Sequence, residues 1–598
     1  MSKHDHLTRR DFLKLTGAGV GAAILAACQK RIGLTEIPPA TGTAIPSGTT
    51  LLPPGTATNT TLANATPIPA GTTPNTIFTN GRIMTVDAAN SISEAIAIKG
   101  DKILSVGNNE VIRALADSTT KIIDLNGRTV TPGFIDPHLH FSPFGLQNTY
   151  YTPFMPPDVT DIPNLQRALA DDLKGLPSGE WVMGYYLGLT DKMVPTREDL
   201  DPVSRENPVF IMHIGGHWGT ANSAAIQLAG ITNSTPSPEG GIIEKVNGEL
   251  TGVFYNHRAM DLLRRYAPPV TITEVKQSII DAQKAFAACG VTCFHDNNIR
   301  NVENIQAYQE LTREGKLFLR NELYLTLEYP ADMEHVAQVQ PMDNGMTHFA
   351  GYKFLIDGQG PTAYCHEPTN GVEWQLPTWN PQEFKDTIKS LHDTGLQICV
   401  HCIGDAAADL TLEAYETAMN ANPRSDPRHR IEHAVITTPQ ATQKMKDLGV
   451  VVSTQPAFIY IFGKGWKTIF TPAQMERICV TREWLDAGVH VAIGSDAPSM
   501  PLYNPQTTLA GAMTRYTKEM NQIGGDQVFD FTQALRAHTY EGAYAAHQEK
   551  NLGTLEAGKL ADLVVWPEDP SQLNAGELVK TTSVDMTMVG GKVVYEKG

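Results

Sequence analysis

The residues in this chain whose types and spacing suggest chemistry are His138 and His140. They end the run PGFIDPHLH at residues 132–140, which predicts an apolar strand followed by His-x-His. Alternate side chains of a strand share one face, so two imidazoles at this spacing point the same way and can bind one divalent ion. Taken alone, the pattern fits two solvated histidines equally well.

Two further histidines and one aspartate also stand at the ends of apolar runs. His401 ends ICVH, His433 ends RIEH, and Asp496 follows VAIGS. The catalytic residues of a β/α barrel come from the carboxyl ends of its strands, so residues in these positions are expected to meet. The sequence therefore predicts a metal site. For Asp496 the alternative is a helix N-cap, since the run SDAP has that character.

The middle of the chain alternates strand-like runs with helical runs, the pattern of parallel β/α units. It predicts a distorted (β/α)8 TIM barrel over residues 132–549, in the α/β class, with an insertion at about 145–270 that is too long for a single loop. Expected helices include 272–289 and 381–393. The expected strands are 130–135, 291–294, 352–356, 397–401, 430–433, 450–454 and 489–493.

Both ends of the folded part are rich in short alternating strands and tight turns. Residues 77–131 and 550–598 are therefore expected to form one small β-sandwich domain together. The run GKLAD at 558–562 lies in this domain, and we interpret it as a structural turn.

Composition narrows the class of protein. The chain has 598 residues, 41% of them hydrophobic, and a formal net charge of -17. This balance fits a globular protein with a large core and argues against a nucleic-acid surface. Its seven cysteines are scattered and do not suggest a disulfide framework. Cys399 and Cys402 flank His401 in a run that resembles a buried strand, which argues against redox chemistry there.

The first 28 residues resemble an export address. The run TRRDFLK at 8–14 is similar to a twin-arginine signal, and LAAC at 25–28 is similar to a bacterial lipobox in which Cys28 is acylated. Residues 35–76 contain 13 Thr, 8 Pro and one charged residue, so 29–76 are expected to form a disordered tether. The predicted location is outside the cytoplasm, in the periplasm or at the outer cell face, with a lipid anchor in the membrane.

Taken together, the motifs after about residue 76 resemble those of the amidohydrolase superfamily, and within it the branch called amidohydrolase family 3. The branch also has a lysine before an Asp-Gly pair, found here as Lys353 before residues 357–358. The other matching runs are PGFIDxHxH at 132–140, VHCIGD at 400–405, RHRIEH at 428–433, GSDAP at 494–498 and LGTLEAGKLADL at 552–563.

The resemblance implies one or two divalent metal ions, with zinc expected. His138 and His140 would bind one ion. His401 and His433 would bind the second, and a carboxylated Lys353 would bridge the two. The alternative for Lys353 is a snorkelling residue or an ion-pair partner.

The resemblance also implies that Asp496 contacts metal and transfers protons. Its carboxylate would take a proton from the attacking water and give it to the leaving nitrogen.

The insertion departs from the branch, whose members often show Asp-Gly-His followed by Asn-Ser. Here residues 215–223 read GGHWGTANS, so the acid is replaced by Gly215. His217 is expected to bind the substrate, with a structural imidazole as the alternative. His295 is expected to orient a metal ligand or to pack beside it. The role of His366 stays open.

The expected activity is hydrolysis of carbon–nitrogen bonds other than peptide bonds. The implied substrates are small molecules: amides, N-acyl or N-formyl compounds and cyclic amides. Three alternatives remain, which are an esterase or lactonase that uses the same site, a lipid-anchored solute-binding protein without turnover, and a catalytically silent relative. The sequence does not predict the oligomeric state.

Overall fold

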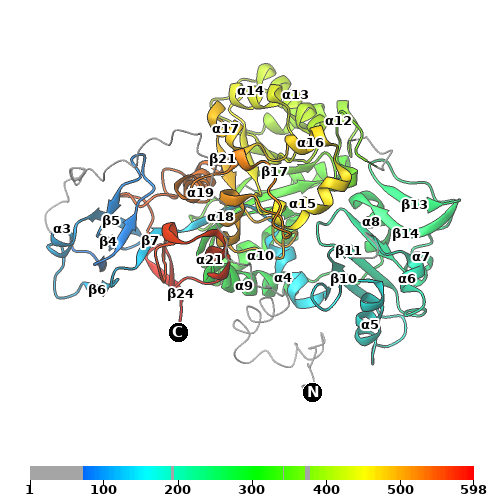
Figure 1. Ribbon diagram of the computed structural model, residues 1–598, viewed down its shortest axis with the longest axis horizontal. Helices are drawn as coiled ribbons and strands as arrows, with labels where there is room; N and C mark the ends of the chain where they lie inside the picture. The colour runs from blue at the N-terminus through cyan, green and yellow to red at the C-terminus, as the bar shows by residue number, and fades with distance from the viewer. Residues whose placement is uncertain (1–71, 190–193, 341, 371–376) are drawn as a thin grey trace.

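A computed structural model describes residues 72–189, 194–340, 342–370 and 377–598. The export address with Cys28 and nearly all of the proposed tether lie outside these residues. A barrel occupies the centre of Figure 1, a β-sandwich lies on its left and the insertion on its right. Among the described helices, none has both the length and the apolar character needed to cross a membrane.

The barrel consists of eight parallel strands in the order β21-β20-β19-β18-β17-β16-β15-β8, which confirms the predicted α/β fold. Backbone hydrogen bonds join the end of the first strand, β8, to the segment that follows the last strand, β21. Asp496 N donates to His138 O at 2.8 Å, and His140 N donates to Ala497 O at 2.7 Å. The strands are β8 Phe134–Leu139, β15 Val291–Ile299, β16 Arg320–Leu327, β17 Thr347–Leu355, β18 Gln397–Cys402, β19 Arg430–His433, β20 Val451–Thr454 and β21 Val491–Ile493.

Two details of the barrel differ from the sequence prediction. The strand expected at 130–135 is divided at Gly133 into β7 (Thr129–Pro132), which belongs to the sandwich, and β8. A Cβ atom at Gly133 would lie 2.1 Å from Thr292 Oγ1, so only glycine fits this junction. The prediction also omitted β16, whose sequence RNELYLTL begins with three polar residues that obscure its apolar character.

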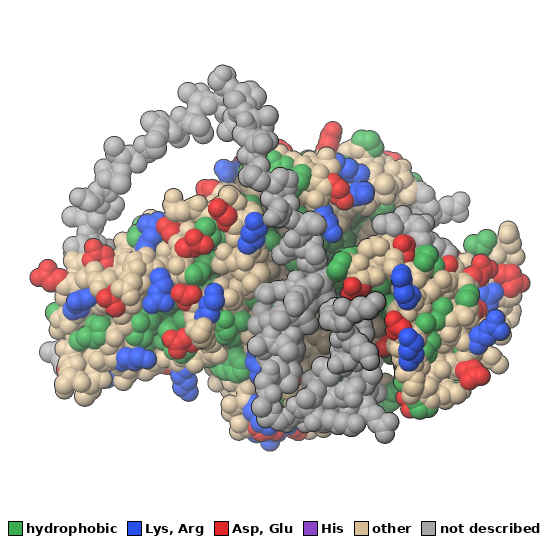
Figure 2. All heavy atoms as spheres, turned by 60° about the horizontal axis from the view of Figure 1, so that its bottom comes forward, with side chains coloured by type: hydrophobic (Ala, Val, Ile, Leu, Met, Phe, Trp, Pro, Cys, Tyr) green, Lys and Arg blue, Asp and Glu red, His purple; other side chains and the backbone are tan. Residues whose placement is uncertain are grey.

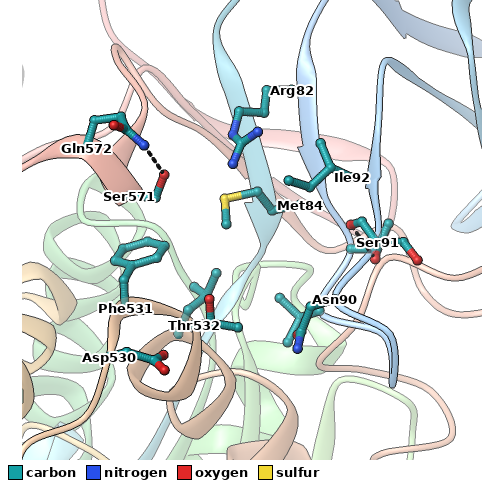
Figure 3. Close-up of a pocket in the computed structure, with 13 residues that line it drawn as sticks. Arg82, Met84, Asn90, Ser91, Ile92, Asp530, Phe531, Thr532, Ser571 and Gln572 are labelled. Atoms are coloured by element: carbon teal, nitrogen blue, oxygen red, sulfur yellow. Dashed lines mark hydrogen bonds between the residues drawn. The ribbon is translucent and has the colours of Figure 1, made fainter. Parts of the chain in front are cut away.

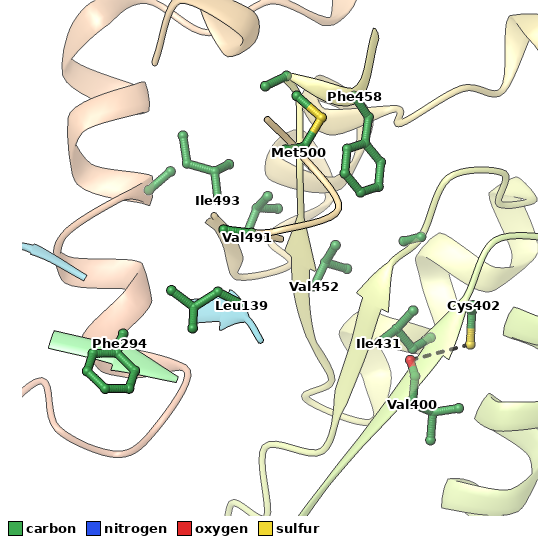
Figure 4. Close-up of a cluster of buried hydrophobic side chains, with 14 of the residues drawn as sticks. Leu139, Phe294, Val400, Cys402, Ile431, Val452, Phe458, Val491, Ile493 and Met500 are labelled. Atoms are coloured by element: carbon green, nitrogen blue, oxygen red, sulfur yellow. Dashed lines mark hydrogen bonds between the residues drawn. The ribbon is translucent and has the colours of Figure 1, made fainter. Parts of the chain in front are cut away.

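Helices cover the outside of the barrel and bury its apolar residues. Figure 4 shows Val400, Ile431, Val452 and Val491 from neighbouring strands, all fully buried, in one cluster with Phe458. The covering helices include α4 Phe141–Tyr150, α9 Ile272–Ala288, α10 Val302–Arg313, α12 Pro381–His392, α13 Asp405–Ala421, α14 Pro439–Asp447, α15 Phe458–Ile469, α17 Thr481–Ala487, α18 Pro505–Thr514, α19 Phe531–Ala537 and α20 Tyr540–Tyr544.

Both ends of the described chain build the β-sandwich. One sheet has the order β5-β4-β1-β6 and the other β24-β23-β22-β7-β2-β3. Phe78, Ile96 and Leu563, from these two sheets, are fully buried in the core between them. The strands are β1 Thr76–Thr79, β2 Arg82–Met84, β3 Ile92–Ser93, β4 Ala95–Lys99, β5 Lys102–Gly107, β6 Lys121–Asp124, β22 Leu563–Val565, β23 Met586–Val589 and β24 Lys592–Glu596.

The insertion is a separate six-stranded sheet with the order β13-β14-β12-β11-β10-β9. The helix α4, which precedes this sheet, packs on the barrel: the rings of Phe144 and Phe286 lie 5.0 Å apart. The elements of the insertion are β9 Thr152–Phe154, α5 Ile162–Asp172, β10 Val182–Tyr186, α6 Arg197–Leu200, β11 Val209–His213, β12 Trp218–Ala221, α7 Ser223–Leu228, β13 Ile242–Val246, β14 Glu249–Tyr255 and α8 Asn256–Arg264.

Two surface features lie away from the barrel mouth. On the face in Figure 2, acidic and basic side chains of the described residues are interspersed. A pocket of about 360 Å³ opens where the sandwich meets α19, between Arg82 and Met84 on β2 and Phe531 on α19 (Figure 3). None of the residues predicted to bind metal or substrate lines it.

Candidate metal centre

A compact group of potential metal ligands lies at the carboxyl ends of the barrel strands. One ligand atom each from His138, His433 and Asp496 lie within 4.8 Å of one another, and all three residues are buried. His138 comes from β8, His433 ends β19, and Asp496 follows β21. The barrel thus brings together residues that are far apart in the sequence.

The other two predicted histidines border this group. His140 Nε2 lies 3.1 Å from Asp496 Oδ1, and His138 Nε2 lies 3.4 Å from the same oxygen. The ring of His401 lies 4.5 Å from that of His433, between centroids. All four predicted histidines and Asp496 therefore lie in one cluster.

A buried ion pair orients His138. Its Nδ1 contacts Glu432 Oε2, and Arg430 binds both oxygens of the same carboxylate, with Nε to Oε1 at 2.7 Å. Arg430 is held in turn by Pro137 O at 2.6 Å and by His295 Nδ1 at 3.0 Å. With Nδ1 turned to the carboxylate, His138 presents Nε2 to the cavity, as carboxylate-supported histidine ligands do.

Polar groups also fix the neighbouring histidines. His433 Nδ1 hydrogen-bonds to Gln455 Oε1 at 2.6 Å. Asp357 Oδ1 lies 3.6 Å from His401 Nε2. The Asp357 carboxylate accepts backbone N–H groups from Tyr364, Ile403 and Gly404 at 2.8–3.2 Å, which hold it in place.

The electrostatics keep these imidazoles neutral. Burial lowers the pKa of His433 to about 4 and holds the pKa of His401 well below its usual value. Burial and the charge of Lys353 do the same for His138. Burial opposes ionisation of Asp496, but hydrogen bonding and charge from His140 outweigh it and lower the pKa of this carboxyl. Neutral imidazoles and a carboxylate are the forms that bind metal.

Two of these side chains stand on unusual backbone. The φ angles of His433 and Asp496 are 70° and 55°, in the left-handed region that residues other than glycine seldom adopt. Such conformations cost about 1–3 kcal/mol each and concentrate at functional sites. The backbone therefore turns where these two side chains are presented, and Ala434, next to His433, has the same kind of conformation with a φ of 47°.

Lys353 enters the cavity from β17. Its side chain is 1% exposed, and its Nζ lies 3.4 Å from His138 Nε2. Burial lowers its pKa, which increases the neutral fraction of the amine. This buried position argues against the alternative of a snorkelling surface lysine.

His217, from the insertion, lies beside the same cluster. Its ring lies 4.8 Å from that of His401, and burial lowers its pKa to about 3. At Gly215, which replaces the acid of the branch, a Cβ atom would lie 1.8 Å from Gln359 Oε1, so the end of that flexible side chain would have to move. By contrast, His366 is 55% exposed and pairs with Asp409 at 2.8 Å, outside the cluster.

The residues present fit a divalent cation. Three imidazoles and one carboxylate converge, and His401 Nε2 is buried without a hydrogen-bond partner among the described residues. Nitrogen and oxygen donors at this density are typical of zinc and related metals. Those donors come from the ends of four different strands, so the site exists only in the folded barrel.

Several residues of the site had no role in the sequence interpretation. Glu432 and Arg430 lie inside the RIEH motif. Because they are two positions apart on a strand, with Ile431 between them, the sequence could have indicated that both point into the barrel. Asp136 is fully buried and accepts a hydrogen bond from Ser495 N at 3.1 Å, across the closure of the barrel. Burial raises its pKa to about 7. Gln455 gave no sequence signal.

Comparison with known proteins agrees with this geometry. Residues 121–595 match the model of the amidohydrolase family. An N-substituted formamide deformylase of Arthrobacter pascens is 28% identical over 87% of this chain and 98% of its own length.

Among solved structures, an uncharacterized metal-dependent hydrolase from Pyrococcus horikoshii has a TM-score of 0.67 and 24% identity, over 84% of this chain and 99% of its own. One from Pyrococcus furiosus has a TM-score of 0.65 and 25% identity, over 83% and 100%. The chain therefore belongs to the amidohydrolase family and is a hydrolase of carbon–nitrogen bonds.

Proposed function

We propose that this protein hydrolyses small amides, including N-acyl, N-formyl or cyclic amides, with the help of one or two divalent ions. The observation that carries the proposal is the buried cluster of His138, His433 and Asp496, in which neutral imidazoles adjoin an ionised carboxylate. The relative from Arthrobacter pascens, an N-substituted formamide deformylase, supports a substrate of this kind.

His138 and His140 would hold one ion, and His401 and His433 the second, with zinc as the proposed metal. Lys353 would bridge the two as a carbamate, formed when its neutral amine adds carbon dioxide and releases one proton to solvent. Its burial and lowered pKa support that modification, because only the neutral amine reacts. If Lys353 stays unmodified, the site would hold a single ion.

When bound, the ion supplies a water whose pKa is near 7 and polarises the carbonyl of the substrate. Asp496 accepts a proton from the attacking water and delivers it to the leaving nitrogen. In this structure His140 Nε2 lies 3.1 Å from Asp496 Oδ1, so an ion bound by both residues would take the place of that contact. His217, kept neutral by burial, binds the carbonyl of the substrate as a hydrogen-bond donor.

Removal of metal tests this proposal. We expect chelation to abolish amide hydrolysis, and added zinc or manganese to restore it. His433→Ala should lose bound metal as measured by elemental analysis, whereas His366→Ala, at an exposed histidine outside the cluster, should retain it. A matched panel of amides and esters shows which bond is preferred. Full turnover by the metal-free protein would refute the metal role.

We further propose that the protein is exported and anchored by lipid at Cys28. The support is the run TRRDFLK at 8–14 followed by LAAC at 25–28. In a bacterial host, Cys28→Ala should release the protein from the membrane fraction, and replacing Arg9 and Arg10 by lysine should retain it in the cytoplasm. Unchanged fractionation of both variants would contradict the address.

A further inference from the structure

We propose that Gln455 positions His433 as a metal ligand and makes the ion at His401 and His433 the more weakly bound of the two. Gln455 would be a positioning residue, because it acts through His433 and does not contact the reacting atoms. This inference rests on the proposed function, since it ranks the two ion positions of the same site. The ranking concerns metal binding and does not depend on which bond is hydrolysed.

Residues at and just after the end of β20 hold His433 on three sides. Thr454 Oγ1 donates to His433 O at 2.8 Å, and Gln455 Oε1 lies 2.6 Å from His433 Nδ1. The ring of Phe458 is stacked on the imidazole, with 5.7 Å between centroids and 18° between planes. The φ of His433 is 70°, which residues other than glycine seldom adopt without such support. The direction of this imidazole therefore depends on its contacts with this segment.

The amide oxygen of Gln455 selects the tautomer of His433. A carbonyl oxygen only accepts hydrogen bonds, so His433 Nδ1 carries the proton and Nε2 is the ring atom that can bind a cation. Gln455 is fully buried, and its Nε2 has no hydrogen-bond partner among the described residues. Since a buried donor without a partner is unfavourable, the contribution of this side chain lies in its oxygen.

The histidines of the other ion position have charged support. His138 Nδ1 contacts the carboxylate of Glu432. Asp496 Oδ1 lies 3.4 Å from His138 Nε2 and 3.1 Å from His140 Nε2. A carboxylate acceptor makes an imidazole a more basic ligand, and its hydrogen bonds are stronger than those of a neutral amide. This pair is therefore expected to bind its ion first.

The second pair has weaker support at the corresponding atoms. The acceptor at His433 Nδ1 is the neutral amide of Gln455. Asp357 Oδ1 lies 3.6 Å from His401 Nε2, which is beyond hydrogen-bond distance. The ion at this pair is therefore expected to bind second and to exchange more readily.

Zinc affinities, measured by competition with a chromophoric chelator in a bicarbonate-containing buffer, test the ranking. We expect the second ion of wild type to bind about tenfold or more weakly than the first. Gln455→Met, which keeps the volume and removes the acceptor, should weaken the second ion by about a further tenfold and leave the first within about twofold. Gln455→Glu should tighten the second ion by about threefold or more. Gln443→Glu, at an exposed position, is the charge-matched control and should change neither affinity.

The tautomer of His433 is measured without metal or substrate. Nitrogen-15 NMR of the metal-free protein, labelled at histidine, distinguishes a protonated Nδ1 from a protonated Nε2, and loss of signal in His433→Ala identifies the residue. We expect Nδ1–H in wild type and a mixture of the two tautomers in Gln455→Met. Circular dichroism checks that each variant is folded.

Several outcomes would overturn the inference. They are a single bound zinc, two zinc ions of equal affinity, equal weakening of both ions in Gln455→Met, or Gln455→Glu binding no tighter than wild type. An Nε2–H tautomer of His433 in wild type would end the positioning role. Each result is compatible with continued amide hydrolysis, whereas ranked zinc binding without hydrolysis would support the inference and contradict the proposed function.

Discussion

The two ends of the barrel each contain a histidine–carboxylate pair, and the two pairs have opposite electrostatics. Near the amino ends of the strands, His348 Nδ1 lies 2.5 Å from Glu322 Oε2, and this hydrogen bond raises the pKa of His348. At the mouth, His138 contacts Glu432, yet its pKa is lowered, first by burial and then by Lys353.

The difference arises from what surrounds each carboxylate. Arg430 pairs with Glu432 and neutralises its charge. With Lys353 also nearby, protonation of His138 would add a further buried positive charge, which is unfavourable. Glu322 has no comparable arginine partner among the described contacts. Burial raises the pKa of this carboxyl, and its hydrogen bond raises the pKa of His348, which is 32% exposed. The same residue pair thus shifts the pKa of its histidine in opposite directions at the two ends of the barrel.

The largest effect is expected for Asp496→Asn at the mouth. An amide cannot take the proton of the attacking water, so kcat/KM should fall by about 10²–10⁴-fold. His348→Gln, at the opposite end, should stay within twofold of wild type. Metal content is measured alongside activity. If the variant binds metal and keeps a tenth or more of the activity, Asp496 does not transfer the proton.

A smaller effect is expected for the support of His138. Glu432→Gln should weaken zinc affinity by about 10–100-fold, because the imidazole loses its charged partner. Competition with a chromophoric chelator measures this, and circular dichroism checks the fold. Glu322→Gln is the matched variant at the other end and should bind zinc as wild type does. Equal weakening in both variants would show that the two pairs are not functionally distinct.

The smallest effect is expected in the pH dependence of stability. Because the folded-state pKa of His348 is raised, folding favours its protonated form, and that stabilisation is fully present below about pH 6.5. It is lost as pH rises through the raised pKa. His348→Gln should therefore reduce the fall in Tm between pH 6 and pH 8. An unchanged pH profile would mean that the pair at this end contributes nothing measurable.

Much of the fold could be predicted from the sequence, because the candidate site residues stand at or just after the ends of the strands. Three of the predicted strands end in His138, His401 or His433, or lead directly to them, and the alternation with helices predicted the barrel. The split at Gly133 was not predictable, since it depends on the approach of Thr292 from a strand that begins far along the chain.

The supporting residues were harder to predict than the proposed ligands. Glu432 contacts His138 across 294 positions of sequence, and no local pattern specifies that contact. Such a role depends on which side chains meet across the barrel, and that requires the folded structure.

The closure of the barrel has a consequence for biosynthesis. Asp136 and the Ser495 amide that it binds are separated by 359 positions, and His138 and Asp496 meet at the same closure. A nascent chain still attached to the ribosome lacks one half of this closure until almost all of the polypeptide has been made. The full set of proposed ligands therefore exists only in chains that extend to Asp496, and a chain that ends before this residue would lack the carboxylate of the site.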